Sequence, residues 1–222
     1  LKQRDPIAVI GMGCRFPGGS DSPEAFWRLL ENGTDAVREV PVERWDANRL
    51  HDPAVGTPGK STNRHGAFLE GDVAACDARF FGLAPAEALA LDPQQRLLLE
   101  VSWESLEHAC LDPRALRGSR TGVFIGMSTL DYLLSTMHGS DLSRIDPYSL
   151  VGAMFCSAAG RIAYFFDFVG PTLTLDTACS SSLTAVHLAS QSLRRRETDL
   201  ALAGGINLLL SPAGHIGLSA MG

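Results

Sequence analysis

The sequence predicts an α/β fold with helices layered against a sheet, because apolar strand-like runs alternate with helical patterns along the chain. Five runs fit strands: residues 6–13, 120–128, 172–175, 199–205 and 206–210. Most residues in them are apolar, as in strands that are covered on both faces. The last two runs are too close for a helical crossover. The final strand is therefore expected to run antiparallel to its neighbour, in a mixed five-stranded sheet.

Length, composition and charge are those of an ordinary globular chain. The 222 residues are 45% hydrophobic with a formal net charge of -6, and a chain of this length can bury a sizeable core in one or two domains. The one basic run, at 194–196, follows a helical pattern whose dipole it complements. We therefore expect no nucleic-acid partner. We also expect no membrane span, because no apolar run is long enough.

The cysteines and the first five residues indicate the cellular compartment in which the protein is expected. Five cysteines without a short paired spacing argue against a disulfide framework and against a zinc site. Free thiols fit a reducing compartment, so a cytoplasmic location is expected. Residues 1–5 lack the apolar region of a signal peptide. They are interpreted as the remnant of an upstream linker, with the domain itself at 6–222.

The first apolar run ends in a glycine pair at positions 11 and 13, which invites a dinucleotide-binding interpretation. That fingerprint needs a third glycine at its sixth position, and Phe16 stands there, followed by a turn. A nicotinamide site is therefore disfavoured. Ser22 and Pro23 then supply the cap and first residue of a short helix, which Gly33 ends.

Residues 34–92 are expected to form a surface excursion, because most of the stretch is rich in Pro, Gly, Asp and Asn without a sustained period. His51 and His65 lie in it without a metal-ligand spacing, so both are interpreted as surface hydrogen-bonding residues. Two longer helices are predicted beyond it. One runs from an Asp92 cap to about residue 110, and the other covers 150–166.

The stretch at 172–192 is the most informative, and Cys179 lies within it. A strand pattern ends at residue 175 and a helical pattern begins at Cys179. The N–H groups and dipole of a first helical turn favour negative charge, so a cysteine there carries more of the nucleophilic thiolate. On the residues alone, a nucleophile and a small buried residue are equal alternatives. The small buried residue is the interpretation for Cys14, Cys76, Cys110 and Cys156.

Four motifs resemble the ketosynthase (β-ketoacyl synthase) domains of modular type I polyketide synthases. They are DTACSSSL at 176–183, CRFPGG at 14–19, DPQQRLLLE at 92–100 and GRIAY at 160–164. The resemblance covers nearly the whole chain and implies the N-terminal half of a thiolase-like fold, in which two similar halves pack their central helices together. The helix at Cys179 would be the central helix of this half, and a homodimer is implied.

The same resemblance implies the chemistry of an acyltransferase. Cys179 would accept an acyl chain from the phosphopantetheine arm of an acyl carrier protein, with its own N–H as half of an oxyanion hole. A malonyl-type extender would then decarboxylate and attack the acyl thioester in a Claisen condensation. The implied partners are carrier protein domains, the C-terminal half of the ketosynthase and the acyltransferase domain of the same synthase. No bound cofactor or metal is implied.

The catalytic histidines and the ordering lysine of the family stand in motifs that this chain lacks. Outside those motifs fall His51, His65, His108, His138, His187 and His215. His138 lacks the threonine-glycine pattern that follows the family's first catalytic histidine, and His187 is interpreted as a hydrogen-bonded polar residue. The chain is therefore expected to hold the nucleophile and to be inactive in condensation by itself.

The chain departs from the family pattern at 151–153, where relatives usually carry threonine, glycine and asparagine. The resemblance implies that this segment borders the acyl pocket. The pocket candidates are Ala153, Met154, Phe155 and Cys156, of which Met154 and Phe155 are bulky enough to narrow a channel. The alternative is that both are ordinary helix-packing residues.

Three other functions remain open. A ketosynthase of the fatty-acid type would share the motifs. A structural or chain-length partner that has lost its chemistry is disfavoured, because such relatives replace the cysteine. A cysteine hydrolase would need a histidine base oriented by Asn or Asp, for which no local signature is found.

Overall fold

The computed structural model describes residues 6–136 and 146–222, which fall into two compact units. The described part of the first unit comprises residues 6–13, 74–130 and 146–207. That of the second comprises residues 14–73, 131–136 and 208–222. Cys179 and the pocket candidates at 153–156 all lie in the first unit.

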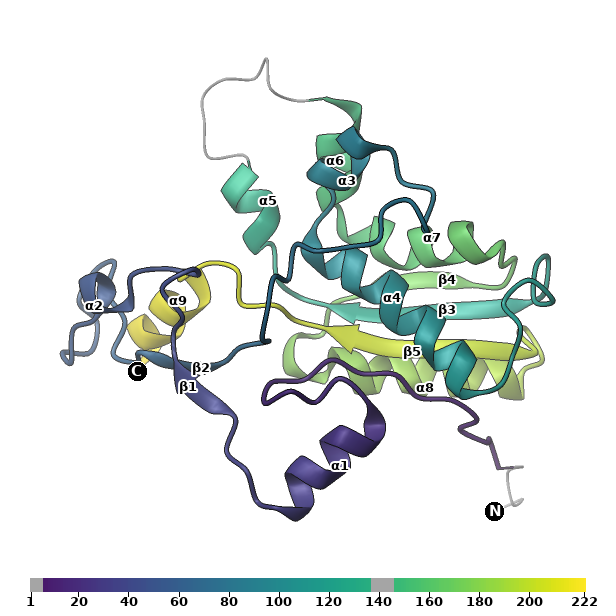
Figure 1. Ribbon diagram of the computed structural model, residues 1–222, viewed down its shortest axis with the longest axis horizontal. Coiled ribbons are helices and arrows are strands. Elements are labelled where there is room, and N and C mark those ends of the chain that lie inside the picture. The colour runs from purple at the N-terminus through teal and green to yellow at the C-terminus, as the bar shows by residue number, and fades with distance from the viewer. Residues whose placement is uncertain (1–5, 137–145) are drawn as a thin grey trace. The chain divides into compact units, whose positions relative to one another are not determined.

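A parallel sheet forms the centre of the first unit (Figure 1). Its strands stand in the order β4 (Thr172–Leu175), β3 (Thr121–Met127), β5 (Leu200–Ile206), and both outer strands run parallel to β3. The predicted α/β architecture is confirmed. The strand count is not, because the sheet in the described residues has three parallel strands instead of five mixed ones.

Helices cover both faces of this sheet. α4 (Pro93–His108) and α7 (Phe155–Phe166) pack on one face, and α8 (Ser181–Arg194) packs on the other (Figure 1). Asp92 caps α4 by accepting a hydrogen bond from the Gln94 N–H at 2.8 Å, and Pro93 takes the first helical position. The helix predicted from this cap is confirmed.

The core lies on both sides of β3, whose seven residues are all buried. Successive side chains of a strand point to opposite faces. The side chains in the core toward α4 and α7 are Val123, Ile125 and Met127. Phe124 instead packs against Ala185 and Ala189 of α8. The edge strand β4 was expected to be buried, yet its Thr172 and Leu173 are exposed, because in the described residues no strand pairs with its outer side.

The first turn of α8 lies directly on the backbone of two strands. A Cβ at Gly126 of β3 would lie 2.6 Å from the carbonyl carbon of Ser181. A Cβ at Gly205 of β5 would lie 2.7 Å from the Cβ of Ser182. Carbon atoms in a packed interior stand about 3.5–4.0 Å apart, so a side chain at either position would push the helix off the sheet.

The strand predicted over residues 6–13 is absent. The segment lies along α4, where a Cβ at Gly11 would lie 2.3 Å from the carbonyl oxygen of Ser105. The N–H of Met12 donates to Nδ1 of His108 at 3.3 Å. The apolar run predicts a strand buried in the sheet, but its glycines bring the backbone against a helix.

The strand predicted over residues 206–210 is also absent. β5 continues through the glycines at 204 and 205 and ends at Ile206, and residues 207–210 form no strand. The sequence interpretation ended one strand and began another at the glycine pair. Gly205 instead stays in the strand, where its missing side chain makes room for α8.

The helix predicted over residues 150–166 is two helices. α6 (Pro147–Ala153) and α7, which begins at Phe155, are separated by Met154 and bent by 95°. Met154 has φ -76 and ψ 137, which is an extended conformation. No single helix in the described ranges is long and apolar enough to cross a membrane. The bent pair of α6 and α7 passes that test by length and composition only.

The second unit contains short elements only. They are α1 (Pro23–Glu31), β1 (Val37–Glu39), α2 (Ala47–Leu50), β2 (His65–Ala67), α5 (Asp131–Thr136) and α9 (Ala213–Met221). Ser22 caps α1 as predicted, and β1 pairs antiparallel with β2. The buried Asp131 carboxylate accepts hydrogen bonds from the N–H groups of Leu210 and Ser211 at 3.1 and 2.9 Å. The remaining short helix, α3 (Pro85–Ala90), belongs to the first unit.

We expect Gly126→Ala to lower the free energy of unfolding by about 1–3 kcal/mol, because the added methyl meets the backbone of α8. Gly204→Ala is the matched control, since a Cβ at Gly204 meets nothing within 4 Å. It should be neutral or stabilise by up to about 1 kcal/mol. Urea denaturation of both variants measures the difference. Equal midpoints would show that α8 does not depend on this approach.

Candidate active site

Cys179 lies at the junction between β4 and α8. It is the middle residue of a single 3-10 turn, Ala178–Ser180, and α8 begins directly after it. The predicted place of the cysteine, between a strand and a helix, is confirmed, although the α-helix itself starts two residues later than expected. The side chain of Cys179 is exposed, so a reagent or substrate can reach the thiol.

Side-chain hydrogen bonds fix this junction. Asp176 Oδ1 accepts from the Ala178 N–H at 2.8 Å. The Ser181 hydroxyl accepts from the Thr177 N–H at 2.9 Å and donates to the Ala178 carbonyl at 2.7 Å. Ser128, just past the end of β3, lies 3.2 Å from the same hydroxyl, oxygen to oxygen. The turn is thereby tied both to the helix it precedes and to the central strand.

Ala178, directly before the cysteine, is held in a left-handed conformation. Its φ is 54, a region in which a residue with a Cβ costs about 1–2 kcal/mol. Such strain persists only where the surrounding contacts determine the conformation. The hydrogen bonds to the N–H and the carbonyl of Ala178 supply those contacts. The chain therefore reverses sharply and presents Cys179 at the surface.

The backbone around the thiol is arranged to receive negative charge. The first N–H groups of α8 follow Cys179 directly, and such groups lack partners within their own helix. Among the described residues, no hydrogen bond from the Cys179 N–H is found. A carbonyl oxygen that becomes an anion beside the sulfur could therefore accept a bond from this N–H.

The other cysteines do not share this setting. Burial raises the pKa of the Cys76 thiol, and the Glu100 carboxylate raises it further. The interpretation of the four as small buried residues is wrong for Cys110 and Cys156, which are exposed. Cys110 follows the end of α4 with a left-handed φ of 55, and Cys156 lies in the first turn of α7. The apolar residues near Cys110 and Cys156 in the sequence indicate burial, but both cysteines lie at helix ends, and the sequence does not show which side of a helix end faces the solvent.

The pocket candidates surround the break between α6 and α7. Ala153 is buried, Met154 is 40% exposed, Phe155 packs partly against the core, and Cys156 is exposed. The Ala159 N–H donates to Oγ1 of Thr174 at 3.1 Å, which sets the first turns of α7 beside the end of β4. The break and the Cys179 turn therefore lie at the same edge of the sheet, where its parallel strands end.

The described histidines of the first unit are not placed to assist the thiol. His187 is exposed on α8 two turns beyond Cys179, and His108 accepts from the Met12 N–H at the end of α4. No hydrogen bond joins a histidine to Cys179 in the described part of the chain. In the second unit, His51 and His215 bond backbone carbonyls. His138 lies outside the described residues.

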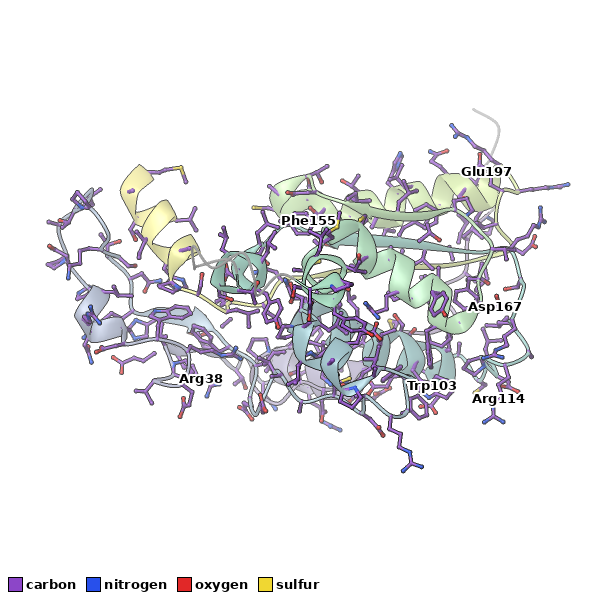
Figure 2. The ribbon with its side chains drawn as sticks, turned by 90° about the horizontal axis from the view of Figure 1, so that it is seen from above. Arg38, Trp103, Arg114, Phe155, Asp167 and Glu197 are labelled. Atoms are coloured by element: carbon purple, nitrogen blue, oxygen red, sulfur yellow. The ribbon has the colours of Figure 1, made fainter. Side chains whose placement is uncertain are left out.

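A second feature of the first unit is a cavity of about 210 Å³. Its lining is mainly aromatic and comprises Phe80, Trp103, Pro113, Arg114, Arg117, Phe165 and Phe166. Figure 2 shows Trp103 and Arg114 toward the Asp167 end of α7, whereas Phe155 lies at the other end of that helix. The cavity is thus separate from the Cys179 edge. In the described ranges, no group of three or more His, Cys, Asp or Glu could hold a metal ion.

Comparison with known proteins gives a consistent family. The family model described as "Beta-ketoacyl synthase, N-terminal domain" matches residues 4–222. The phenolphthiocerol/phthiocerol polyketide synthase of Mycobacterium tuberculosis has a polypeptide that is 52% identical over 215 residues, which are 97% of this chain and 12% of that protein. The phthioceranic/hydroxyphthioceranic acid synthase of the same organism is 50% identical over 218 residues, which are 98% of this chain and 10% of that protein.

Solved structures agree. An oxazolomycin ketosynthase domain from Streptomyces albus superposes with a TM-score of 0.87 at 39% identity, over 98% of this chain and 38% of that one. The ketosynthase from module 6 of the bacillaene synthase of Bacillus subtilis superposes with a TM-score of 0.82 at 33% identity, over 98% of this chain and 34% of that one. The chain thus spans about a tenth of the two mycobacterial synthases and just over a third of the solved domains. The likeness also confirms the thiolase-like fold expected from the motifs.

Proposed function

The chain belongs to the β-ketoacyl synthase family through its N-terminal domain, and from that premise we propose that Cys179 is the nucleophile that accepts the growing acyl chain in polyketide elongation. The observation that carries the proposal is the junction itself. An exposed thiol stands between a parallel strand and the first turn of a helix, directly after a strained Ala178 whose N–H and carbonyl are both hydrogen-bonded. Such a place leaves the sulfur open to an acyl thioester and offers N–H donors to an oxyanion.

In the proposed loading step, the Cys179 sulfur attacks the carbonyl carbon of an acyl thioester on the phosphopantetheine arm of a carrier protein. A carbon–sulfur bond forms, and the carbonyl oxygen carries the negative charge, which the Cys179 N–H stabilises. The bond to the pantetheine sulfur then breaks, and that sulfur leaves and takes up a proton. The acyl group is left on Cys179.

In the proposed condensation step, a malonyl-type extender loses its carboxylate as CO₂. The electron pair released forms the new carbon–carbon bond to the acyl carbonyl, and the Cys179 thiolate is the leaving group. Negative charge develops on the extender's thioester oxygen before the new bond forms, and preorganised donors must face that oxygen. The family's histidine and lysine motifs, which this chain lacks, would supply them from the C-terminal half of the ketosynthase.

The proposed partners follow from the same reaction. Carrier protein domains would deliver both substrates, and the acyltransferase domain of the same synthase would charge the extender. A C-terminal half and a second copy would complete the fold and the homodimer. The support in this chain is apolar surface beside the site, on α8 and β4, with Leu183 74% exposed and Leu173 45% exposed. A cytoplasmic location is part of the proposal, supported by five cysteines that form no disulfide in the described part of the chain.

Cys179→Ala should abolish loading from an acyl thioester and leave the fold intact, because the lost sulfur is exposed and small. Mass spectrometry of the acylated protein measures the loading. Cys110→Ala, which removes another exposed thiol, should load normally. Iodoacetamide should modify Cys179 first in the unsubstituted chain, and Cys76 last. Normal loading of Cys179→Ala would exclude this cysteine as the nucleophile.

Met154→Ala or Phe155→Ala should change the chain-length preference of loading, since either side chain could narrow the acyl channel. We expect a change of about 10-fold in the ratio of kcat/KM for long and short acyl donors. Tyr164→Ala, at the far end of the same helix and 88% exposed, is the control. Should neither Met154→Ala nor Phe155→Ala move that ratio in the complete synthase, both are ordinary packing residues.

Residues 1–222 by themselves should load acyl groups slowly and form no β-ketoacyl product. Attack by the thiolate needs the Cys179 turn alone, whereas condensation also needs the enolate donors. Each missing donor costs about two to three powers of ten in rate. Acyl and malonyl carrier substrates supplied to the purified chain provide the test. A β-ketoacyl product at an enzymatic rate would mean that the chain already holds the complete catalytic set.

A further inference from the structure

The DPQQR stretch of the 92–100 motif has no chemistry in the proposed function, yet it contacts the break between α6 and α7. Gln95 lies in the first turn of α4 and is 1% exposed. Its side-chain amide donates to the carbonyl of Gly152 at 3.0 Å and to the carbonyl of Met154 at 3.2 Å. One buried side chain therefore binds both sides of the break.

These contacts satisfy the groups that a helix break exposes. The last carbonyls of a helix lack partners within it, and an unpaired buried carbonyl costs about 1–3 kcal/mol. The Gly152 carbonyl also accepts from the Asp92 N–H at 2.9 Å. Gly152 is in turn pressed against the end of α3, where a Cβ would lie 2.4 Å from the Ala90 carbonyl oxygen. The break is thus held by fixed partners on α3 and α4.

A second side chain fixes the direction of the Gln95 amide. Oε1 of Gln95 accepts a hydrogen bond from Nε of Arg161 on α7 at 3.4 Å, and a guanidinium can only donate. The amide NH₂ must therefore face the two carbonyls. Arg161 also pairs with Glu87 of α3, with 2.5 Å between nitrogen and oxygen and both side chains mostly buried. We call Glu87, Gln95 and Arg161 the clamp.

We propose that the clamp positions Met154 and Phe155 and thereby sets which acyl chains Cys179 accepts. Its three members come from α3, α4 and α7, and the segment they hold lies at the same edge of the sheet as the Cys179 turn. They act through the backbone of the break, so they are positioning residues. The inference rests on the proposed function, which makes residues 153–156 the wall of the acyl pocket.

The decisive variant is Gln95→Met, which keeps the length of the side chain and removes its donors and its acceptor. Gln94→Met is the matched control. Gln94 is equally buried in the same turn, but its amide bonds the Asp92 carboxylate and the Thr129 hydroxyl. Asp92 reaches the break through its backbone N–H, which Gln94→Met keeps. Both variants should lose stability. Only Gln95→Met should change the ratio of kcat/KM for long and short acyl donors in the complete synthase, by about 10-fold.

A second measurement follows the break without any acyl substrate. Cys156 is exposed two residues past Met154 in the first turn of α7, so its alkylation rate reports the conformation of that turn rather than access to the thiol. Gln95→Met and Glu87→Ala should change that rate at least about fivefold relative to Cys110 in the same chain, because the turn loses its fixed partners. Glu87→Gln keeps a hydrogen-bond acceptor for Arg161 and should return the rate most of the way to that of the unsubstituted chain.

The outcomes separate this inference from the function on which it rests. Shifts in both the Cys156 rate and the chain-length ratio, confined to the clamp variants, would support it. If Met154→Ala moves the ratio and Gln95→Met lowers all rates equally, the clamp is merely structural and the inference fails while the pocket stands. If Met154→Ala and Phe155→Ala both leave the ratio unchanged, the pocket assignment fails, and the clamp's effect on acyl choice fails with it.

Discussion

The close approach of α8 to the sheet is the constraint on which the site depends. Its first residues rest on the backbone of β3 and β5, at Gly126 and Gly205, where any side chain would collide with them. Ser181 serves two purposes at this contact. Its backbone meets Gly126, and its hydroxyl closes the Cys179 turn through Thr177 and Ala178. A shift of α8 would therefore move the turn, so the position of the Cys179 thiol depends on the packing of α8 against the sheet.

On the opposite face of the sheet, α7 brings the break at Met154 to the same edge as the Cys179 turn. α7 packs there, and its first turns stand beside the end of β4. A continuous helix from residue 147 would carry residues 153–156 straight on along its axis. The 95° bend instead leaves Met154 at a corner, with its carbonyl bonded by Gln95. The Cys179 turn and the proposed pocket wall are thus held independently. Glycines and a serine hold the turn, and buried charged and amide side chains hold the wall.

The sequence predicts best the features that depend on neighbouring residues. The Asp92 and Ser22 caps, the strand at the centre of the sheet and the strand-to-helix junction at Cys179 were all found where expected. The misplaced elements depend on distant partners. In the sequence alone, Gly205 indicates the end of a strand, whereas in the structure it stays in β5 and makes room for α8. The pattern over 150–166 likewise indicates one helix, whereas in the structure Gln95 bonds residue 154 at a break. For the proposed role of Cys179, the junction presents an exposed thiol beside free N–H groups, and the DTACSSSL motif favours acyl transfer among the reactions open to such a thiol.

The two faces of α8 connect the chemistry to the fold. The face toward the sheet buries Ala185 and Ala189, while Leu183 and Val186 face outward and are 74% and 48% exposed. Apolar side chains of this size stabilise a fold when another surface covers them. In the proposed enzyme that surface is the other half of the ketosynthase, which would also bring the enolate donors. Covering α8 and completing the condensing site would then be the same event. The thiol would meet an extender only where the donors for its enolate are already in place, whereas loading could precede it.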